Sequence, residues 1–192
     1  MNLNNFTFNT TSGIRFGSGM SVSSSQEICK ILGSNILFIT DKDLMSLKLT
    51  EPTLNELKKF SSKVEIFEDV EADPSLKTLL KSIEIGKKMK ATGVIGFGGG
   101  SSMDVAKLTS LILGSDENIE EVWGVSNAKG PRLPLVLVPT TAGTGSEVTP
   151  ISIITVGEEE KKGVSSPIIL PDVAILDPDL TIGLPAHTTA AT

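Results

Sequence analysis

A run of glycine and serine separates a short apolar segment from a helix-like segment in residues 94–107, which read VIGFGGGSSMDVAK. Because residues 98–100 are glycines without a Cβ, a phosphate can approach the main chain closely there. Ser101 and Ser102 are expected to cap the following helix and to donate hydroxyl hydrogen bonds. The first helical N–H groups and the positive end of the helix dipole face the same anion. The segment therefore predicts a phosphate-binding turn of a nucleotide site.

The spacing of this turn differs from that of the two most familiar phosphate loops. The chain contains no G-x-x-x-x-G-K-[ST] motif. The G-x-G-x-x-G motif also fails, because Ser101 and Met103 stand where its last glycine should be. We therefore predict a dinucleotide pyrophosphate site of a third kind. The alternative is a tight βα turn that binds nothing.

A second polar segment, PTTAGTGSE at residues 139–147, follows the apolar run at 135–138. It holds four hydroxyl side chains and two glycines within nine residues. Ligands commonly bind at the carboxyl ends of parallel strands, where short donors can reach ribose, carboxamide or phosphate oxygens. The segment favours a ligand-binding loop. A polar loop that bonds only to itself is the alternative.

Asp41 directly follows the apolar run at 35–40. Sheets that bind nucleotides often place an acid after a strand, where its carboxylate accepts hydrogen bonds from the adenosine ribose. The same carboxylate repels an added 2′-phosphate, so Asp41 favours NAD over NADP. As an alternative, Asp41 caps the helix that follows, and one side chain can do both.

Apolar runs and helix-like segments alternate along the chain. We expect strands at 35–40, 64–67, 94–97, 135–138 and 173–176, and helices at 24–32, 52–60, from Asp73-Pro74 onward, 101–113 and 118–123. Residues 6–16 are predicted to be extended or a hairpin, and residues 151–169 to form a hairpin around a charged turn at 157–162. This alternation predicts an α/β fold with a doubly wound, mostly parallel sheet and a β-hairpin insertion.

Three motifs, GGGSSMDVAK, PTTAGTGSEVT and LPDVAILDPDL, occur in this order. Together they closely resemble the amino-terminal half of the iron-containing alcohol dehydrogenases, from about Phe6 to the last residue. The resemblance implies a Rossmann-like fold, NAD as cofactor, and hydride transfer between NAD(H) and a small primary alcohol or aldehyde. Glycerol dehydrogenases and dehydroquinate synthases share the GGGS turn and are an alternative, although the PTTAGTGSE segment speaks against them. A non-catalytic module that binds nucleotide or protein is a further alternative.

In that family an all-helical domain follows, and its first helix opens with A-A-T-G-x-D-A-x-x-H, whose Asp and His are metal ligands. This sequence reaches only Ala190-Ala191-Thr192 of the pattern. The resemblance therefore implies that residues 1–192 are a single dinucleotide-binding domain, ending before the ligands for Fe²⁺ or another divalent metal. We expect this chain alone to be inactive, and we assign no catalytic residue and no metal ligand within it.

The resemblance implies contacts with the cofactor for eight residues besides Asp41, namely Gly99, Gly100, Ser101, Asp104, Thr140, Thr141, Thr144 and Lys162. The glycine turn matches the pyrophosphate site, and the acid of the following helix matches a group on the nicotinamide side of the cleft. The threonines match residues beside the adenine and the nicotinamide. The lysine matches one that reaches the nicotinamide ribose, with a solvated charged turn as the alternative.

Charge and composition narrow the possible partners. The formal charge of −6 and the isoelectric point near 4.9 argue against a nucleic-acid surface. Because no apolar run approaches the length of a membrane span and residues 1–13 lack the apolar stretch of a secretory signal, we expect a cytoplasmic protein. The single cysteine, Cys29, excludes an intrachain disulfide, and the single histidine, His187, cannot build a usual transition-metal site. The resemblance implies a homodimer that pairs through residues 6–16.

Overall fold

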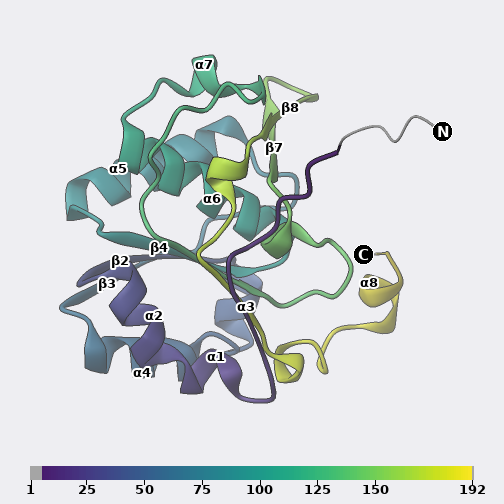
Figure 1. The fold of residues 1–192 in the computed structure, drawn as a ribbon. Coiled ribbons are helices and arrows are strands. Elements are labelled where there is room, and N and C mark those ends of the chain that lie inside the picture. Colours follow the sequence, from purple (N-terminus) through teal and green to yellow (C-terminus); the bar gives the residue numbers. More distant parts are fainter. Residues whose placement is uncertain (1–5, 192) are drawn as a thin grey trace.

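A six-stranded parallel sheet forms the centre of the computed structural model, which describes residues 6–191 (Figure 1). The order across the sheet is β1-β9-β6-β4-β2-β3, with bounds β1 Ile14–Phe16, β2 Asn35–Ile39, β3 Lys63–Phe67, β4 Gly93–Gly98, β6 Leu135–Pro139 and β9 Val173–Leu176. The α-helices are α1 Met20–Ser23, α2 Ser25–Leu32, α3 Lys42–Ser46, α4 Glu51–Phe60, α5 Leu76–Met89, α6 Gly100–Ser115, α7 Ile119–Val122 and α8 Ala186–Ala191. The predicted α/β fold with a mostly parallel, doubly wound sheet is confirmed.

A second, three-stranded sheet contains the predicted hairpin. Its order is β5-β8-β7, with bounds β5 Gly124–Val125, β7 Ile151–Val156 and β8 Glu160–Ser165. Strands β7 and β8 are antiparallel, and β5 adds a short parallel pairing to β8. Short 3₁₀ turns, η1 Ser146–Val148, η2 Pro167–Ile169 and η3 Pro178–Leu180, complete the connections.

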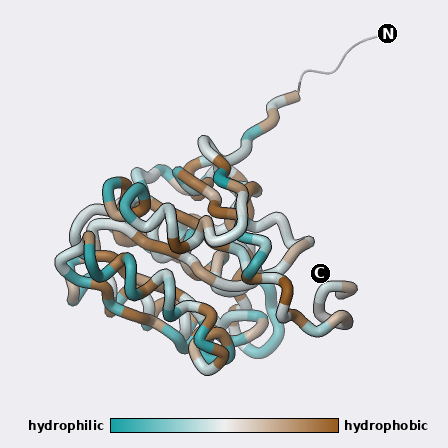
Figure 2. Tube along the Cα trace, turned by 90° about the horizontal axis from the view of Figure 1, so that it is seen from below, coloured by the Kyte–Doolittle hydropathy of each residue, from teal (hydrophilic) through white to brown (hydrophobic). Residues whose placement is uncertain are grey.

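The apolar strands are continuous because helices cover both faces of the main sheet. Along β2, Leu37 and Ile39 pack into the cluster that includes α5 and α6, whereas Ile36 and Phe38 pack into the cluster that includes α2 and α4. Figure 1 shows these helix pairs on opposite sides of the sheet. In Figure 2 the hydrophobic segments run through the middle of the molecule. The alternation of side chains between two buried faces therefore explains a strand with no polar face.

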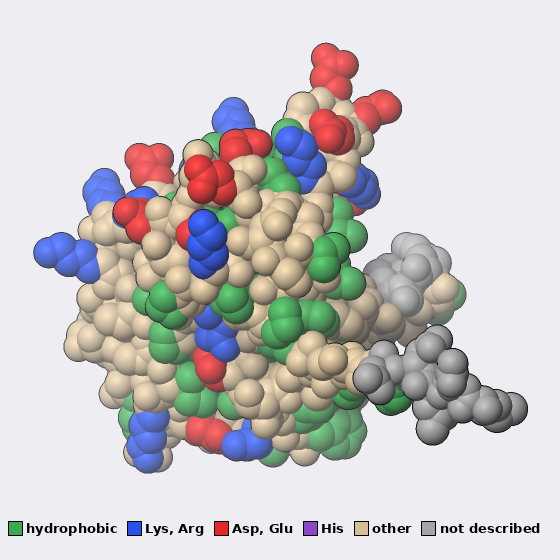
Figure 3. Space-filling model, turned by 45° about the horizontal axis from the view of Figure 1, so that its top comes forward, with side chains coloured by type: hydrophobic (Ala, Val, Ile, Leu, Met, Phe, Trp, Pro, Cys, Tyr) green, Lys and Arg blue, Asp and Glu red, His purple; other side chains and the backbone are tan. Residues whose placement is uncertain are grey.

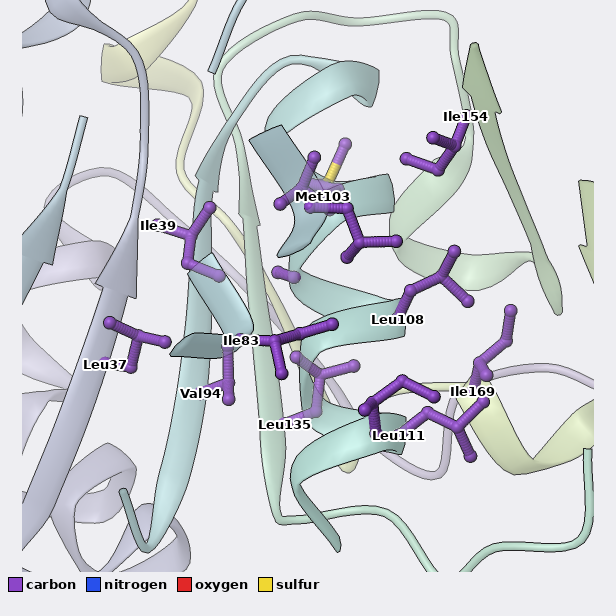
Figure 4. Packing of buried hydrophobic residues seen from close by; sticks show 14 of the residues in the cluster. Leu37, Ile39, Ile83, Val94, Met103, Leu108, Leu111, Leu135, Ile154 and Ile169 are labelled. Atoms are coloured by element: carbon purple, nitrogen blue, oxygen red, sulfur yellow. The ribbon is translucent and has the colours of Figure 1, made fainter. Parts of the chain in front are cut away.

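Helix α6 is buried almost all round, because it lies between the main sheet and the hairpin sheet. Leu108 and Leu111 of α6 are fully buried in a cluster shared with Leu135 of β6 and Ile154 of β7 (Figure 4). The middle of α6 is thus packed from two sides. We therefore expect the amino terminus of α6 to hold a fixed position when a ligand binds there.

The order of connections creates a crevice at one edge of the sheet. From β2 the chain passes to β3 on one side of β2 and then returns to β4 on the other side. Numbered from β2, the strands lie in the order 2-1-3-4-5, so the direction of winding reverses between β2 and β4. In open parallel sheets, ligands bind at such a switch point, beyond the carboxyl ends of the strands.

Three local predictions were wrong or incomplete. Helix α5 is capped by Ser75, whose Oγ accepts a hydrogen bond from the Thr78 N–H at 3.2 Å, and not by the Asp73-Pro74 pair. Asp73 has a left-handed backbone (φ +54°), the Thr155 N–H donates to the Pro74 carbonyl at 2.8 Å, and Ser75 forms a bridge with Thr155 of β7. The charged turn of the hairpin is shorter than predicted, because β8 already begins at Glu160. Of residues 6–16, only β1 forms a strand, and it pairs in parallel with β9.

Replacing Asp172 by Asn is expected to lower the free energy of unfolding by about 1 kcal/mol at pH 7. Asp172 Oδ2 accepts hydrogen bonds from Arg132 Nη1 and from the Leu135 N–H, both at 2.8 Å, at the start of β6. Burial raises the pKa of the Asp172 carboxyl. The two hydrogen bonds lower the pKa by more than burial raises it, so the net pKa lies below 3.8. The stabilisation is therefore present above pH 3.8 and is lost as the pH falls through the lower folded-state pKa. Urea unfolding of both proteins at pH 7 and pH 3 should show the difference shrinking at the lower pH.

Candidate functional site

A cleft of about 570 Å³ opens at the predicted edge of the sheet. Its walls come from four connections: residues 41–44 after β2, 68–72 after β3, 99–102 after β4 and 140–141 after β6. Residues 184–185 close one side. The cleft is thus built from the carboxyl ends of neighbouring parallel strands, at the point where the winding reverses.

The glycine turn joins β4 to α6 at the base of this cleft. Gly99 is the N-cap of α6 with an extended backbone (φ −74°, ψ −173°), and no side chain caps the helix. The prediction that Ser101 and Ser102 cap α6 was therefore wrong, because both lie within its first turn. By helix geometry the first N–H groups of α6 have no intrahelical acceptor, and they carry the positive end of the helix dipole. Gly99, Gly100 and Ser101 all line the cleft.

The three glycines serve different purposes. A Cβ on Gly98 would lie 2.7 Å from Ser102 Oγ, and its φ of +152° also disfavours a side chain, so Gly98 is required by the protein itself. A Cβ on Gly99 would find no atom closer than Thr141 Cγ2 at 3.6 Å, and one on Gly100 none closer than Thr144 Cγ2 at 3.4 Å. These are ordinary contacts. Packing within the described chain therefore does not require glycine at 99 or 100, whereas close approach of a ligand would.

The loop after β6 lies opposite the glycine turn. The Thr140 N–H donates to the Gly98 carbonyl at 3.0 Å, which joins the two loops at their base. Thr140 and Thr141 line the cleft, and Thr141 Oγ1 is buried with no hydrogen-bond partner among residues 6–191. Thr144 does not line the cleft but lies next to Gly100. A buried hydroxyl without a partner is uncommon and indicates a place for a ligand or water.

Asp41 lies where both predicted roles, capping a helix and facing a ligand, are open to it. Its Oδ1 accepts a hydrogen bond from the Leu44 N–H at 2.9 Å, so it caps α3, and it also lines the cleft. Burial raises the pKa of the Asp41 carboxyl above 3.8, and the backbone hydrogen bond from Leu44 opposes this shift. The cap fixes the direction of the carboxylate at the end of β2.

Asp104 and Lys162 lie outside the cleft. Asp104 Oδ1 accepts a hydrogen bond from Ser146 Oγ at 2.7 Å, and its Oδ2 accepts one from the Ile153 N–H at 3.0 Å. Lys162 lies within β8, opposite Ile154, and its Nζ is 3.7 Å from Glu120 Oε2. The structure therefore brings six of the nine predicted residues together around the cleft. A contact of Asp104 or Lys162 with the cofactor stays a prediction.

Two further residues of the quoted motifs have roles that the sequence reasoning missed. Lys107, the last residue of GGGSSMDVAK, is fully buried and bonded to the loop after β6. Asp177, in the last motif, accepts hydrogen bonds from the Ser21 N–H at 3.0 Å and from Gly19 N at 3.1 Å. Asp177 thereby ties the β1–α1 loop to the end of β9. In the sequence, the signal for both residues was a charged side chain directly after apolar residues.

Asp177 also lines a second cavity of about 360 Å³, next to the cleft. This cavity lies at the carboxyl ends of β1, β6 and β9, and it shares Thr141 with the cleft. Phe16, Pro139, residues 141–143 and Glu147 form most of its remaining wall. Thr141 is therefore the residue around which the two hollows meet.

Comparison with known proteins places this geometry in a family. A family model described as iron-containing alcohol dehydrogenase matches residues 11–178. The chain belongs to the iron-containing alcohol dehydrogenase family. It is similar to sulfoacetaldehyde reductase of Bilophila wadsworthia, with 33% identity over 188 residues, covering 97% of this chain and 49% of that protein. The members of this family that match the chain are enzymes.

Solved structures of the family share the whole described fold. A 1,3-propanediol oxidoreductase superimposes with a TM-score of 0.92 at 32% identity, covering 98% of this chain and 50% of that chain. A sulfoacetaldehyde reductase from Bifidobacterium kashiwanohense, solved in complex with NAD⁺, gives a TM-score of 0.86 at 30% identity, covering 98% of this chain and 50% of that one. The chain thus spans about half the length of the relatives it matches.

Several observations within this chain show that its cleft fits a dinucleotide. Gly99 and Gly100 leave space that a Cβ would fill, and Thr141 Oγ1 is a buried polar atom without a partner in the described part of the chain. The open N–H groups of α6 suit a diphosphate, and Asp41 suits ribose hydroxyls. The donors and acceptors of the cleft therefore match the chemistry of NAD.

The described residues do not fit a metal ion in the same way. Among residues 6–191, no group of three or more His, Cys, Asp or Glu side chains is arranged to hold one, and the side chain of His187 lies outside the described part. We therefore assign no step through a metal to these residues. On the face drawn in Figure 3, Lys and Arg side chains lie among Asp and Glu side chains. No helix within the described residues is long and apolar enough to cross a bilayer.

Proposed function

We propose that this chain is the NAD(H)-binding half of a metal-dependent alcohol dehydrogenase that acts on a small primary alcohol or aldehyde. When bound, the nicotinamide would accept or donate a hydride at the carbon that bears the alcohol oxygen. The observation that carries this proposal is the glycine turn of α6, which faces the loop after β6 across a cleft at the switch point of the sheet. The relatives that match the chain as alcohol dehydrogenases support the reaction class.

The residues of the cleft have separate tasks in this proposal. The N–H groups at the start of α6, with Ser101, bind the pyrophosphate. Asp41 orients the adenosine ribose, and Thr141 supplies a free hydroxyl between the two cavities. Thr140 holds the two loops together through the Gly98 carbonyl. Binding and orientation are thus the contribution of this half.

Catalysis is proposed to require parts of the protein beyond these residues. We propose that the 192 residues alone bind NAD weakly and do not turn over, since no group of metal-ligating side chains was found within residues 6–191 to support hydride transfer. We further propose a cytoplasmic homodimer that forms through the edge strand β1, where Ile14 and Phe16 are exposed. Sedimentation of wild type and of a Phe16→Glu variant tests the interface.

The direct test of the proposed function is an NAD titration of the complete gene product by isothermal titration calorimetry. We expect saturable binding with one site per chain. A crystal structure with NAD should then place the pyrophosphate at Gly99 and Gly100. Binding of NAD at any other place on the chain would contradict the proposal.

Replacing Asp41 by Asn is expected to raise the affinity for NADP relative to NAD by about tenfold, because the repulsion of the 2′-phosphate is removed. Asn caps helices as well as Asp does, so α3 should remain intact. The ratio of the two dissociation constants is the measurement. Asp116→Asn, which removes an exposed carboxylate that does not line the cleft, is the control and should leave the ratio unchanged. An unchanged ratio in Asp41→Asn would remove the reason for naming NAD.

A further inference from the structure

Lys107 lies two turns into α6 with its side chain fully buried. Its Nζ donates hydrogen bonds to Ser146 Oγ at 2.8 Å, to the Thr149 carbonyl at 3.1 Å and to the Ile151 carbonyl at 2.7 Å. A lysine ammonium has three donors, and all three are used here. The three acceptors belong to one stretch of chain, which runs from the loop after β6 into β7.

Asp104, one turn earlier on α6, forms hydrogen bonds with the same stretch of chain. Its Oδ1 accepts from Ser146 Oγ at 2.7 Å and lies 3.7 Å from Lys107 Nζ. Its Oδ2 accepts from the Ile153 N–H at 3.0 Å, and its main-chain carbonyl accepts from Ser152 Oγ at 2.9 Å. Ser146 therefore bridges the buried cation and the buried carboxylate.

We propose that Lys107, acting with Asp104 through Ser146, is a positioning residue that sets the distance between the loop at 140–149 and the glycine turn. The inference rests on the proposed NAD binding. The loop is joined to the turn at its start, where Thr140 N–H donates to the Gly98 carbonyl, and the Lys107 cluster holds its far end. Thr141 and Thr144 lie between these two attachments. Lys107 itself lines neither cavity, so it acts only through the loop.

A purely structural role for the cluster makes different predictions. Buried ion pairs are weak evidence for stability, since an apolar side chain of similar volume often stabilises as well. What an apolar side chain cannot replace is the set of three directed donors. The Lys107 ammonium is therefore expected to matter more for the position of the loop than for the folded state as a whole.

The test compares Lys107→Met and Ser146→Ala with the wild-type gene product, and uses Ser110→Ala as the matched control. Ser110 is also buried on α6, and its Oγ donates to the Lys107 carbonyl at 2.8 Å without contacting the loop. We expect NAD dissociation constants about tenfold higher in Lys107→Met and Ser146→Ala, and unchanged in Ser110→Ala. Ser146→Ala keeps both charges and remains informative if Lys107→Met does not fold.

Hydrogen exchange without nucleotide separates this inference from the proposed function. We expect faster amide exchange across residues 140–149 in the two loop-linked variants, with residues 93–98 of β4 unchanged. If wild type binds no NAD, the proposed function fails. The exchange result still tests whether Lys107 and Ser146 hold the loop at 140–149. A lower melting temperature with unchanged exchange at 140–149 would overturn the role of Lys107.

The pH dependence provides a second readout. Burial lowers the pKa of Lys107 to about 8, although Asp104 of α6 and Glu147 of η1 oppose the shift. Above that pH the amine has only two donors for three acceptors. NAD affinity of wild type should therefore fall from pH 7 to pH 9, and that of Lys107→Met should stay flat. Between a pH of about 8 and 10.5 the unfolded chain binds more protons than the folded chain, so the Lys107 contribution to global stability rises with pH there, also where the affinity falls. Parallel trends of affinity and stability would contradict the proposal.

Discussion

Gly99→Ala and Gly100→Ala are each expected to weaken NAD binding by about 10- to 100-fold, or about 1.4–2.8 kcal/mol, while the folded state persists. The new Cβ would meet only ordinary contacts within the protein, at 3.6 Å from Thr141 and 3.4 Å from Thr144. It would, however, occupy the space that a pyrophosphate needs over the N–H groups of α6. Calorimetric NAD titrations together with urea unfolding separate the two effects.

The matched control is Gly163→Ala in β8, away from the cleft. A Cβ there would also meet an ordinary contact, the Ser152 carbonyl at 3.5 Å. We expect this variant to bind NAD like wild type. If Gly99→Ala and Gly163→Ala bind NAD equally well, the glycine turn does not hold the pyrophosphate, and the proposed function loses the observation that carries it.

Much of the fold could be predicted from the sequence because its signals are local. The apolar strands and the helices between them follow from patterns within a few residues, as at β2 and α4. Their parallel pairing follows from the alternation itself. The cleft could also be predicted, because Asp41, the glycine turn and Thr140 each follow a strand, and the carboxyl ends of parallel strands share one edge.

The failed predictions concern interactions between segments that are distant in the sequence. Asp73-Pro74 has the composition of a helix start, but Asp73 has a left-handed backbone and the Pro74 carbonyl accepts a hydrogen bond from the Thr155 N–H of the hairpin. The hydrogen bonds of the Asp104 carboxylate with Ser146 and Ile153 could not be predicted either, and a contact of Asp104 with the cofactor stays a prediction. Such contacts depend on where the hairpin sheet packs on α6, which no local pattern encodes. The burial of Lys107 has the same origin.

Gly114→Ala is expected to be the most destabilising of the glycine substitutions considered, lowering the free energy of unfolding by about 2–3 kcal/mol. Ala is preferred over Gly in a helix interior by about 1 kcal/mol, so propensity alone would predict stabilisation of α6. A Cβ at this position, however, would lie 2.4 Å from the Arg132 carbonyl carbon and 2.5 Å from Leu133 N. Both are main-chain atoms of a segment fixed by the Leu133 N–H bond to the Ser110 carbonyl at 2.9 Å, so relief requires α6 to move.

Gly100→Ala, at the other end of the same helix, is the matched control for this steric argument, because its nearest contact is an ordinary 3.4 Å. Urea unfolding should therefore show Gly100→Ala close to wild type and Gly114→Ala well below it. NAD titration should show the reverse ranking at a temperature where both variants are folded. Equal stability of the two variants would mean that the segment at 132–133 yields easily. In that case the close backbone approach does not fix the carboxyl end of α6, and the rigidity attributed to this helix must come from the hairpin sheet and the core cluster alone.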